Sequence, residues 1–436
     1  MRSIHQTLDP ARWPGLLSGV CPDPARSAEL LEKAEGVEPL SLREVADLLR
    51  TDRPDLLEAL RSSALRIKER HFGKVIRLFA PIYFSNDCVN NCVYCGFRRD
   101  NVSATRKTLN LDEVVSEARI LEGRGFKDVI LVASEHPMLA SPAILAGAVD
   151  AVRKETGIRR ITVNSAPLAR EDFELLREAG ADVYQSFQET YDPEAYRLYH
   201  PSGKKHDYDW RLTAMDRAAR AGFREIGMGV LYGLSDPIAD TMALIAHTRY
   251  LMDEFDLPPP GLSFPRLRPA EGSLLEYIPR PVSDAEFMKI LAVCRLALPK
   301  SDISVSTRER PEFRDRLAFA GATRMSAGSE TRPGGYGLSE EGATGQFETA
   351  DPRSADAMVA SLCTRGLLPS MDGGESGEGA EVLTCSAFSS MIRFLLNHAT
   401  PETRAIGEER AIGLLREIFK RGRGAPFDPA TLRATM

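Results

Sequence analysis

Between residue 74 and about residue 345, short runs rich in apolar and β-branched residues alternate with longer segments whose apolar positions recur at helical spacing. The short runs predict strands at residues 75–80, 129–133, 161–164, 183–187, 226–231, 261–264, 303–306 and 323–326. The longer segments predict helices at residues 111–122, 143–154, 208–221, 238–253, 284–297 and 311–320. Strands that alternate with helices in this way are the repeat of a parallel barrel, so the predicted fold class is α/β, a (β/α)8 barrel of the TIM type.

Two extensions flank the predicted barrel. Residues 1–73 show helical patterns, and Ser41 with Glu44 forms the capping-box pattern of a helix start. Residues 346–436 show a further, partly helical extension. The sequence therefore predicts a helical N-terminal extension, a barrel at residues 74–345 and a C-terminal extension.

Composition narrows the class of protein. The 436-residue chain is 43% hydrophobic and 27% charged, with a formal net charge of -6, which gives no reason to expect a nucleic-acid or anionic-membrane partner. No apolar run approaches the length of about 20 residues that a membrane span needs, and residues 1–6 lack the apolar core of a signal peptide. We therefore expect a cytoplasmic protein. Seven cysteines, three of them clustered, fit a reducing compartment better than a disulfide framework.

The clustered cysteines are Cys88, Cys92 and Cys95, on a loop that follows the first predicted strand. Three thiolates at this spacing can bind three irons of a four-iron four-sulfur (4Fe–4S) cluster and leave the fourth iron open. An open position is where a catalytic metal site receives a substrate or cofactor. The alternatives are a zinc site or reduced thiols in the core. Structural zinc usually takes four ligands grouped in pairs, so the spacing favours the cluster.

This spacing resembles the signature of the radical S-adenosylmethionine (SAM) superfamily, in which SAM chelates the open iron and is cleaved to a 5′-deoxyadenosyl radical. The longer segment 81–99 is similar to the aromatic amino acid lyases, especially the tyrosine-cleaving enzymes of thiamine synthesis and of diiron hydrogenase maturation. Segments 187–191 and 265–272 are also close to the lyase pattern. The resemblance implies two cofactors, a 4Fe–4S cluster on the three cysteines and SAM.

Polar residues follow the predicted strands, where a parallel barrel carries its working residues. The resemblance and these positions predict SAM contacts at Tyr94, Glu135, Asn164, Glu189, Arg266 and Arg268. Ser134 stands where the superfamily usually has glycine. The two arginines suit a carboxylate, because the guanidinium fork matches it. Taken alone, a strand-end carboxylate can be satisfied within the protein, and a lone arginine such as Arg268 more often forms an ordinary salt bridge.

In the aromatic amino acid lyases, an arginine, a serine and a tyrosine hold the amino-acid head of the substrate. The matching residues here are Arg308, Ser326 and Tyr83. A carboxylate buried in a barrel mouth requires a paired cation, which gives an arginine there a physical purpose. Tyr83 could instead be a core aromatic residue. His200 and His206 are predicted to be loop residues rather than metal ligands.

The chain departs from the hydrogenase maturase near its C-terminus, where that enzyme carries a second cluster on a C-x2-C pair and a later cysteine. Residues 371–374 read Met-Asp-Gly-Gly, and only Cys385 stands where the later cysteine would be. One thiolate cannot hold that cluster, so we do not expect synthesis of iron-bound carbon monoxide and cyanide. Cys294 and Cys363 are predicted core residues, and a last helix is predicted at 408–420.

The resemblance implies a radical SAM lyase that cleaves the Cα–Cβ bond of a free aromatic amino acid. The expected substrate is L-tyrosine, and the expected products are 2-iminoacetate and p-cresol, with 5′-deoxyadenosine and methionine from SAM. A reducing electron donor of the flavodoxin or ferredoxin type is the implied partner. The alternatives are a tryptophan lyase or related amino acid radical enzyme of specialised metabolism and, from another class, a non-catalytic iron–sulfur carrier or scaffold.

Overall fold

The computed structural model describes residues 3–8, 16, 23–337, 342–373, 405 and 409 of the chain. Within these residues, eight parallel strands form a closed barrel, because β1 pairs with β8 on one side and with β2 on the other. The strands are β1 (Val75–Ser85), β2 (Asp128–Ala133), β3 (Arg160–Asn164), β4 (Val183–Glu189), β5 (Glu225–Val230), β6 (Gly261–Ser263), β7 (Ile303–Val305) and β8 (Arg324–Ser326). The predicted (β/α)8 fold is confirmed. A further strand, β9 (Leu368–Ser370), pairs with the amino end of β1.

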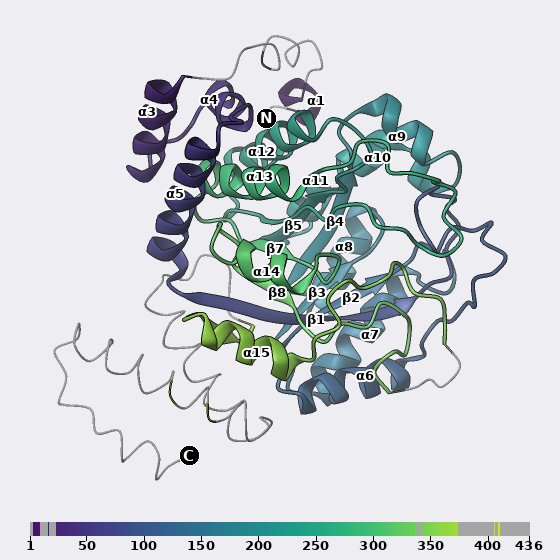
Figure 1. Cartoon of the computed structure of the whole chain (residues 1–436). Coiled ribbons are helices and arrows are strands. Elements are labelled where there is room, and N and C mark those ends of the chain that lie inside the picture. Colours follow the sequence, from purple (N-terminus) through teal and green to yellow (C-terminus); the bar gives the residue numbers. More distant parts are fainter. Residues whose placement is uncertain are drawn as a thin grey trace.

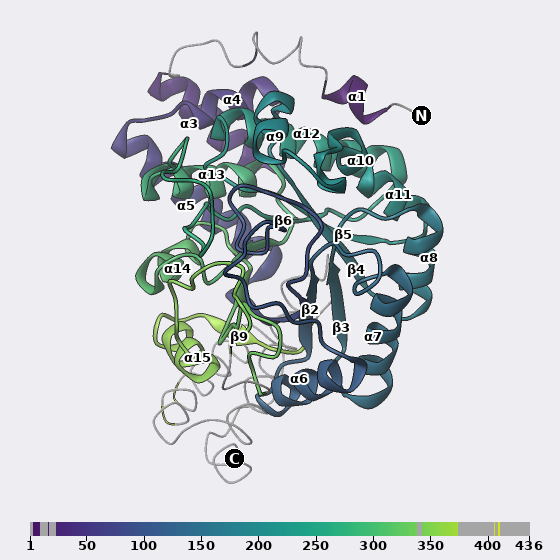
Figure 2. The ribbon, with the colours of Figure 1, turned by 90° about the vertical axis from the view of Figure 1, so that its right-hand side faces the viewer.

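Helices surround the barrel on the outside (Figure 1). They are α6 (Leu111–Gly123), α7 (Pro142–Glu155), α8 (Arg170–Glu178), α9 (Pro193–Tyr199), α10 (Tyr208–Leu212), α11 (Ala214–Arg220), α12 (Pro237–Phe255), α13 (Asp284–Ala297), α14 (Pro311–Leu317) and α15 (Ala355–Thr364). Figure 2 shows α6, α7 and α8 stacked along one side. The predicted helix 208–221 is two helices, since Thr213 donates its hydroxyl back to the carbonyl oxygen of Asp209 at 2.8 Å and the helix breaks there.

The N-terminal helices lie on one side of the barrel (Figure 1). They are α1 (Ile4–Thr7), α3 (Pro24–Glu35), α4 (Leu42–Leu49) and α5 (Pro54–Phe72). The predicted capping box begins α4: the amide of Glu44 donates to the Ser41 hydroxyl at 3.3 Å, and the Ser41 amide donates to the Glu44 carboxylate at 2.7 Å. Helix α5 packs against α13 of the barrel.

Buried ion pairs close the amino end of the barrel. Arg77 pairs with Asp302, Arg324 with Asp128 at 2.5 Å, and Arg160 with Glu225 at 3.1 Å. These residues stand at or near the amino ends of their strands, and all but Glu225 are buried. Each arginine there faces a carboxylate, and the ion pair offsets the cost of burying the two charged groups. The barrel is therefore filled at this end, and open space is left toward the carboxyl ends of the strands.

None of the described helices combines the length and the apolar character needed to cross a bilayer. Cys294 and Cys363 are buried, as predicted for core residues. Cys385 and the helix predicted at 408–420 lie outside the described residues, except for residue 409.

Candidate active site

The cysteine loop, residues 86–99, follows β1 at the carboxyl end of the barrel. One cation holds it: the Arg106 guanidinium donates to the carbonyl oxygens of Asn86 at 2.6 Å, Phe97 at 2.8 Å and Arg98 at 2.6 Å. Hydrogen bonds from a charged donor are stronger than neutral ones. The backbone that carries the cysteines is therefore fixed by the protein itself.

The thiols of Cys88, Cys92 and Cys95 are free and line one cavity. Burial, together with the charge of neighbouring cysteine thiolates, raises the pKa of Cys92 to about 12 and that of Cys95 to about 11. A cationic metal centre reverses this preference, because it is bound by the thiolate form. The donor set thus fits a thiolate-ligated centre.

The arrangement of the thiols differs from that of a single-ion site. In the part of the chain that the structure describes, no three His, Cys, Asp or Glu side chains are grouped as ligands of one metal ion. The thiolates of a 4Fe–4S cluster each bind a different iron, so they do not need to converge on one point.

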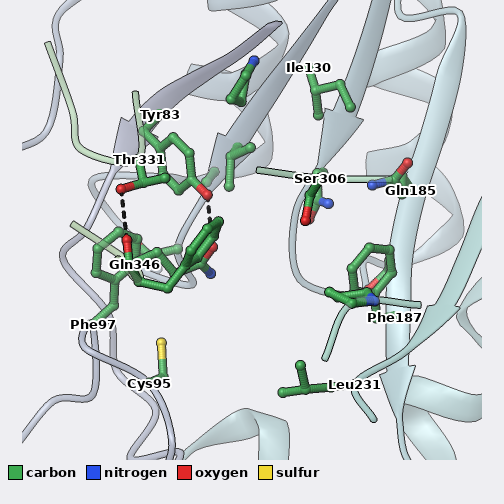
Figure 3. A pocket seen from close by; sticks show the side chains of 18 of the residues that line it. Tyr83, Cys95, Phe97, Ile130, Gln185, Phe187, Leu231, Ser306, Thr331 and Gln346 are labelled. Atoms are coloured by element: carbon green, nitrogen blue, oxygen red, sulfur yellow. Dashed lines mark hydrogen bonds between the residues drawn. The ribbon is translucent and has the colours of Figure 1, made fainter. Parts of the chain in front are cut away.

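The central cavity, as we call it, opens at the carboxyl ends of the strands and measures about 1430 Å³, counting the space open to solvent at its mouth. Most of the predicted site residues line it: Tyr83, Cys88, Cys92, Tyr94, Cys95, Glu135, Asn164, Glu189, Arg308 and Ser326. Figure 3 shows part of this wall, with Cys95 at one end.

The end of β2 is tied to the cysteine loop. The Glu135 carboxylate accepts a hydrogen bond from the Asn90 side-chain amide at 2.7 Å. The backbone carbonyl oxygen of Glu135 accepts another from the Val89 backbone amide at 2.8 Å. Ser134, at the position where glycine is usual, donates its hydroxyl to the carbonyl oxygen of Asp87 at 2.6 Å. The serine therefore serves as an additional link between the strand end and the loop.

Glu189 ends β4 with a backbone φ of 71°, in the left-handed region, where the pairing of β4 with β5 shifts register. Such backbone strain costs about 1–3 kcal/mol and persists where the surroundings fix it. The carboxylate pairs with Lys205 at 2.5 Å, and Lys205 also donates to the Tyr94 hydroxyl at 3.2 Å. Burial lowers the pKa of Lys205, but the charge of Glu189 outweighs it and the pKa is raised overall. A charged pair therefore stands in the cavity wall.

Neither His200 nor His206 lines the central cavity. The His200 ring lies between the Tyr94 hydroxyl, 2.9 Å from Nε2, and the carbonyl oxygen of Tyr196, 2.6 Å from Nδ1. Burial holds the pKa of His200 well below its usual value, so the ring is neutral. His206 Nδ1 lies 2.7 Å from the His200 carbonyl oxygen. Both histidines support the loop that carries Lys205.

Arg308 follows β7, and its guanidinium stacks on Phe347, 3.5 Å from the ring centroid. Among the described residues, no carboxylate forms an ion pair with this guanidinium. Burial lowers the pKa of Arg308, although an arginine stays charged. A cation that faces the cavity without an anionic partner is suited to bind a carboxylate from outside the protein.

The two other predicted head-group residues are already oriented. The Tyr83 hydroxyl donates to Gln346 Oε1 at 2.8 Å, and burial raises the pKa of Tyr83 well above its usual value, so it stays protonated. The Ser326 hydroxyl oxygen accepts a hydrogen bond from the Thr307 amide at 3.1 Å. That bond leaves the Ser326 hydroxyl proton free to donate into the cavity.

The structure does not bring Arg266 and Arg268 into the central cavity. The Arg266 guanidinium donates to the buried Glu309 carboxylate at 3.0 Å and pairs with Asp284 at 2.9 Å. Arg268 donates to Glu309 at 3.1 Å and to the carbonyl oxygen of Arg308 at 2.9 Å. Both arginines are thus engaged within the protein, and Arg268 supports the backbone of Arg308.

Other residues that line the central cavity were not predicted as site residues. Lys205 and Arg211 are cations that follow β4; Arg211 is buried and Lys205 is half-buried. The available signal was their place after the fourth predicted strand. Gln346 and Phe347 lie beyond the last barrel strand, where the sequence has no periodic pattern. A site formed by strand ends thus also includes residues from the segment after the barrel.

Comparison with known proteins agrees with the geometry. Residues 82–245 match the model of the radical SAM superfamily, and residues 263–368 match that of the biotin and thiamin synthesis associated domain. The chain is 33% identical to the 2-iminoacetate synthase of Escherichia coli (strain K12) over 346 residues, which are 79% of this chain and 90% of that protein. The X-ray structure of the FeFe-hydrogenase maturase HydG from Carboxydothermus hydrogenoformans superposes with a TM-score of 0.88 at 35% identity and covers 96% of each chain. The crystal structure of methylornithine synthase (PylB) gives a TM-score of 0.65 at 25% identity, over 78% of this chain and 97% of that chain.

The three-cysteine loop at the open end of a parallel barrel and these matches define one class of protein. The chain belongs to the radical SAM superfamily, among relatives that include 2-iminoacetate synthase and HydG. It is an enzyme that uses a 4Fe–4S cluster and SAM.

Proposed function

We propose that this enzyme cleaves the Cα–Cβ bond of L-tyrosine and releases 2-iminoacetate and p-cresol. The observation that carries the proposal is Arg308, a half-buried cation that faces the same cavity as the three cysteines and has no carboxylate partner among the described residues. A free amino acid brings the missing carboxylate. The relative named 2-iminoacetate synthase supports this reaction class.

In this proposal Cys88, Cys92 and Cys95 hold the cluster, and Glu135 and Glu189 lie in the wall beside it, where SAM would bind. When bound, the two cofactors would supply the radical chemistry that takes one hydrogen atom from the substrate amino group, at the expense of one electron. A second electron and a proton would convert the fragment released from Cβ into p-cresol. The protein positions that hydrogen and excludes competing reactions, since the difficult chemistry belongs to the cofactors.

Several side chains in the cavity position the amino-acid head group of the substrate. Arg308 binds the substrate carboxylate through its guanidinium fork, and Phe347 holds the fork in one plane. Ser326 donates a hydrogen bond to the head group, and Tyr83, held by Gln346, closes the side of the cavity nearest β1. Two or more such contacts fix the amino group relative to the cluster, and fixed geometry is worth several orders of magnitude in rate.

The reaction requires an electron donor, and we propose a flavodoxin- or ferredoxin-type protein of the cytoplasm. Its role is to supply these electrons through the cluster, which would be held by the cysteine loop at the open end of the barrel. The enzyme is thus proposed to work on a small molecule with one transient protein partner.

The test is a product assay. The anaerobic protein, reconstituted with iron and sulfide and reduced, is incubated with SAM and either L-tyrosine or L-tryptophan. We expect p-cresol and 5′-deoxyadenosine to accumulate together with tyrosine. If tryptophan yields indole products while tyrosine yields no p-cresol, the enzyme is a tryptophan lyase and the proposal is wrong.

A further inference from the structure

A patch of polar side chains lines the central cavity without hydrogen-bond partners. Gln185 of β4, Ser263 of β6 and Ser304 of β7 all line this cavity. Among the described residues, neither the Gln185 amide nor the two hydroxyls make a hydrogen bond to the protein. Gln185 is only 9% exposed, so its amide has little access to water outside the cavity. A buried amide without a partner is costly unless a ligand supplies one.

Glycines on the neighbouring strand make room for this amide. A Cβ atom at Gly227 of β5 would stand 2.7 Å from Gln185 Cγ and 2.8 Å from Oε1. A Cβ atom at Gly229 would stand 2.6 Å from Cδ1 of Phe187. The side chains of Gln185 and Phe187 therefore lie against bare backbone, which allows an aromatic ring and a polar group to occupy the same wall.

Gln185 lies on the opposite side of the cavity from part of the head-group region. Figure 3 shows Gln185 and Phe187 on one side of the pocket and Tyr83, Thr331 and Gln346 on the other. Ser304 lies on β7, four residues before Arg308, which follows that strand, so Ser304 is deeper in the barrel. An amino acid whose carboxylate is held by Arg308 would extend its side chain inward, past Phe187, toward Gln185.

We propose that Gln185, with Ser263 and Ser304, hydrogen-bonds the phenolic hydroxyl of the substrate and makes the enzyme select tyrosine over phenylalanine. This inference rests on the proposed function. A phenol both donates and accepts a hydrogen bond, and an amide offers both complements. Phenylalanine would leave the amide unpaired in a desolvated site, and sites of this kind reject the analogue that lacks the polar group by about 10,000-fold or more.

The test compares Gln185→Met with a matched control, Gln188→Met, in the reconstituted full-length holoenzyme. Gln188 lies on the same strand and is also buried, but it does not line the central cavity. The measured quantity is the ratio of kcat/KM for L-tyrosine to that for L-phenylalanine, followed by 5′-deoxyadenosine and aromatic product. We expect Gln185→Met to lower this ratio by about tenfold or more, while Gln188→Met leaves it unchanged.

A second measurement needs no variant. With SAM present, the dissociation constants of L-tyrosine, L-4-aminophenylalanine and L-phenylalanine are determined for the unmodified holoenzyme. We expect the amino analogue, which retains a donor, to bind at least about tenfold more tightly than phenylalanine. Equal binding of phenylalanine and tyrosine, or an unchanged ratio in Gln185→Met, overturns this inference and leaves tyrosine cleavage standing. If the unmodified holoenzyme does not cleave tyrosine at all, both proposals are wrong.

Discussion

The Arg308 guanidinium lies over the ring of Phe347, 3.5 Å from its centroid, although Phe347 is 39 residues further along the chain and beyond the last barrel strand. The ring covers one face of the guanidinium and leaves its edge for a ligand. No carboxylate among the described residues pairs with this cation. The relationship explains how an unpaired arginine is kept in a buried cavity, and two predictions come from it.

The first concerns the charge of Arg308. Arg308→Met should lower kcat/KM for L-tyrosine by about 100-fold or more, because the substrate carboxylate would be buried without its cation. The matched control is Arg310→Met, whose exposed guanidinium pairs with Asp284 outside the cavity. Equal activity in the two variants would show that Arg308 does not bind the substrate.

The second concerns the ring. Phe347→Leu keeps an apolar side chain but removes the cation–π contact, which is worth about 2 kcal/mol in a desolvated site. We expect KM for L-tyrosine to rise about tenfold, since the guanidinium loses its fixed plane. Steady-state kinetics with SAM at saturation measure the change. An unchanged KM would mean that the stack does not orient Arg308.

The third prediction separates the clustered thiols from the core thiols. Replacing Cys88, Cys92 or Cys95 by alanine should abolish cluster assembly, measured as iron and sulfide content after reconstitution. Cys294→Ala should retain the cluster, because Cys294 is fully buried in α13 and burial raises its pKa to about 12, so it stays a neutral thiol. Iron loss in the Cys294 variant, or full iron content in a variant of the loop, would contradict the assignment.

Much of the barrel could be predicted because its strands carry a simple local signal. Most strand residues are buried on both faces, so short apolar runs predicted strands close to β1 to β8, and the polar motifs follow these runs in the sequence. Strand β1 continues through Pro81 to Ser85, past the predicted end at residue 80. A proline removes only one backbone N–H donor from the hydrogen bonds between strands. The other residues of β1 still pair with β2 on one side and β8 on the other, so the strand continues.

The remaining features depend on contacts between distant parts of the chain. Arg77 and Asp302 are 225 residues apart, and Arg324 and Asp128 are 196 apart, so no local pattern could pair them. For the same reason the sequence could not show that Glu309 would engage both Arg266 and Arg268. Strand periodicity can predict which residues face the cavity. It cannot predict which of them already form ion pairs or hydrogen bonds within the protein.

The fourth prediction concerns the ion pairs at the amino end of the barrel. Burial tends to raise the pKa of Asp302, but Arg77 and Arg324 outweigh it and lower the pKa to about 2. A carboxyl whose folded pKa lies below its unfolded value of about 3.9 stabilises the fold above that value and loses this contribution as pH falls through the folded pKa. The Asp302 contribution, about 2 kcal/mol, should therefore be lost between about pH 4 and pH 2.

The variant that tests this is Asp302→Asn, followed by chemical denaturation at several pH values. It should lower the free energy of unfolding at pH 7 by about 3–5 kcal/mol, because the charge of Asp302 no longer offsets the burial of the Arg77 guanidinium. It should also reduce the loss of stability between about pH 4 and pH 2. A variant as stable as the unmodified protein at pH 7 would contradict the role given to this pair.

The central claim is that three thiolates hold the cluster and leave one iron open to SAM. The most direct measurement is the electron paramagnetic resonance spectrum of the reduced, reconstituted enzyme with and without SAM. We predict that SAM shifts the g values of the 4Fe–4S signal, since it becomes a ligand of the open iron. A spectrum that is unchanged by saturating SAM would show that the fourth iron is already ligated and would contradict the claim.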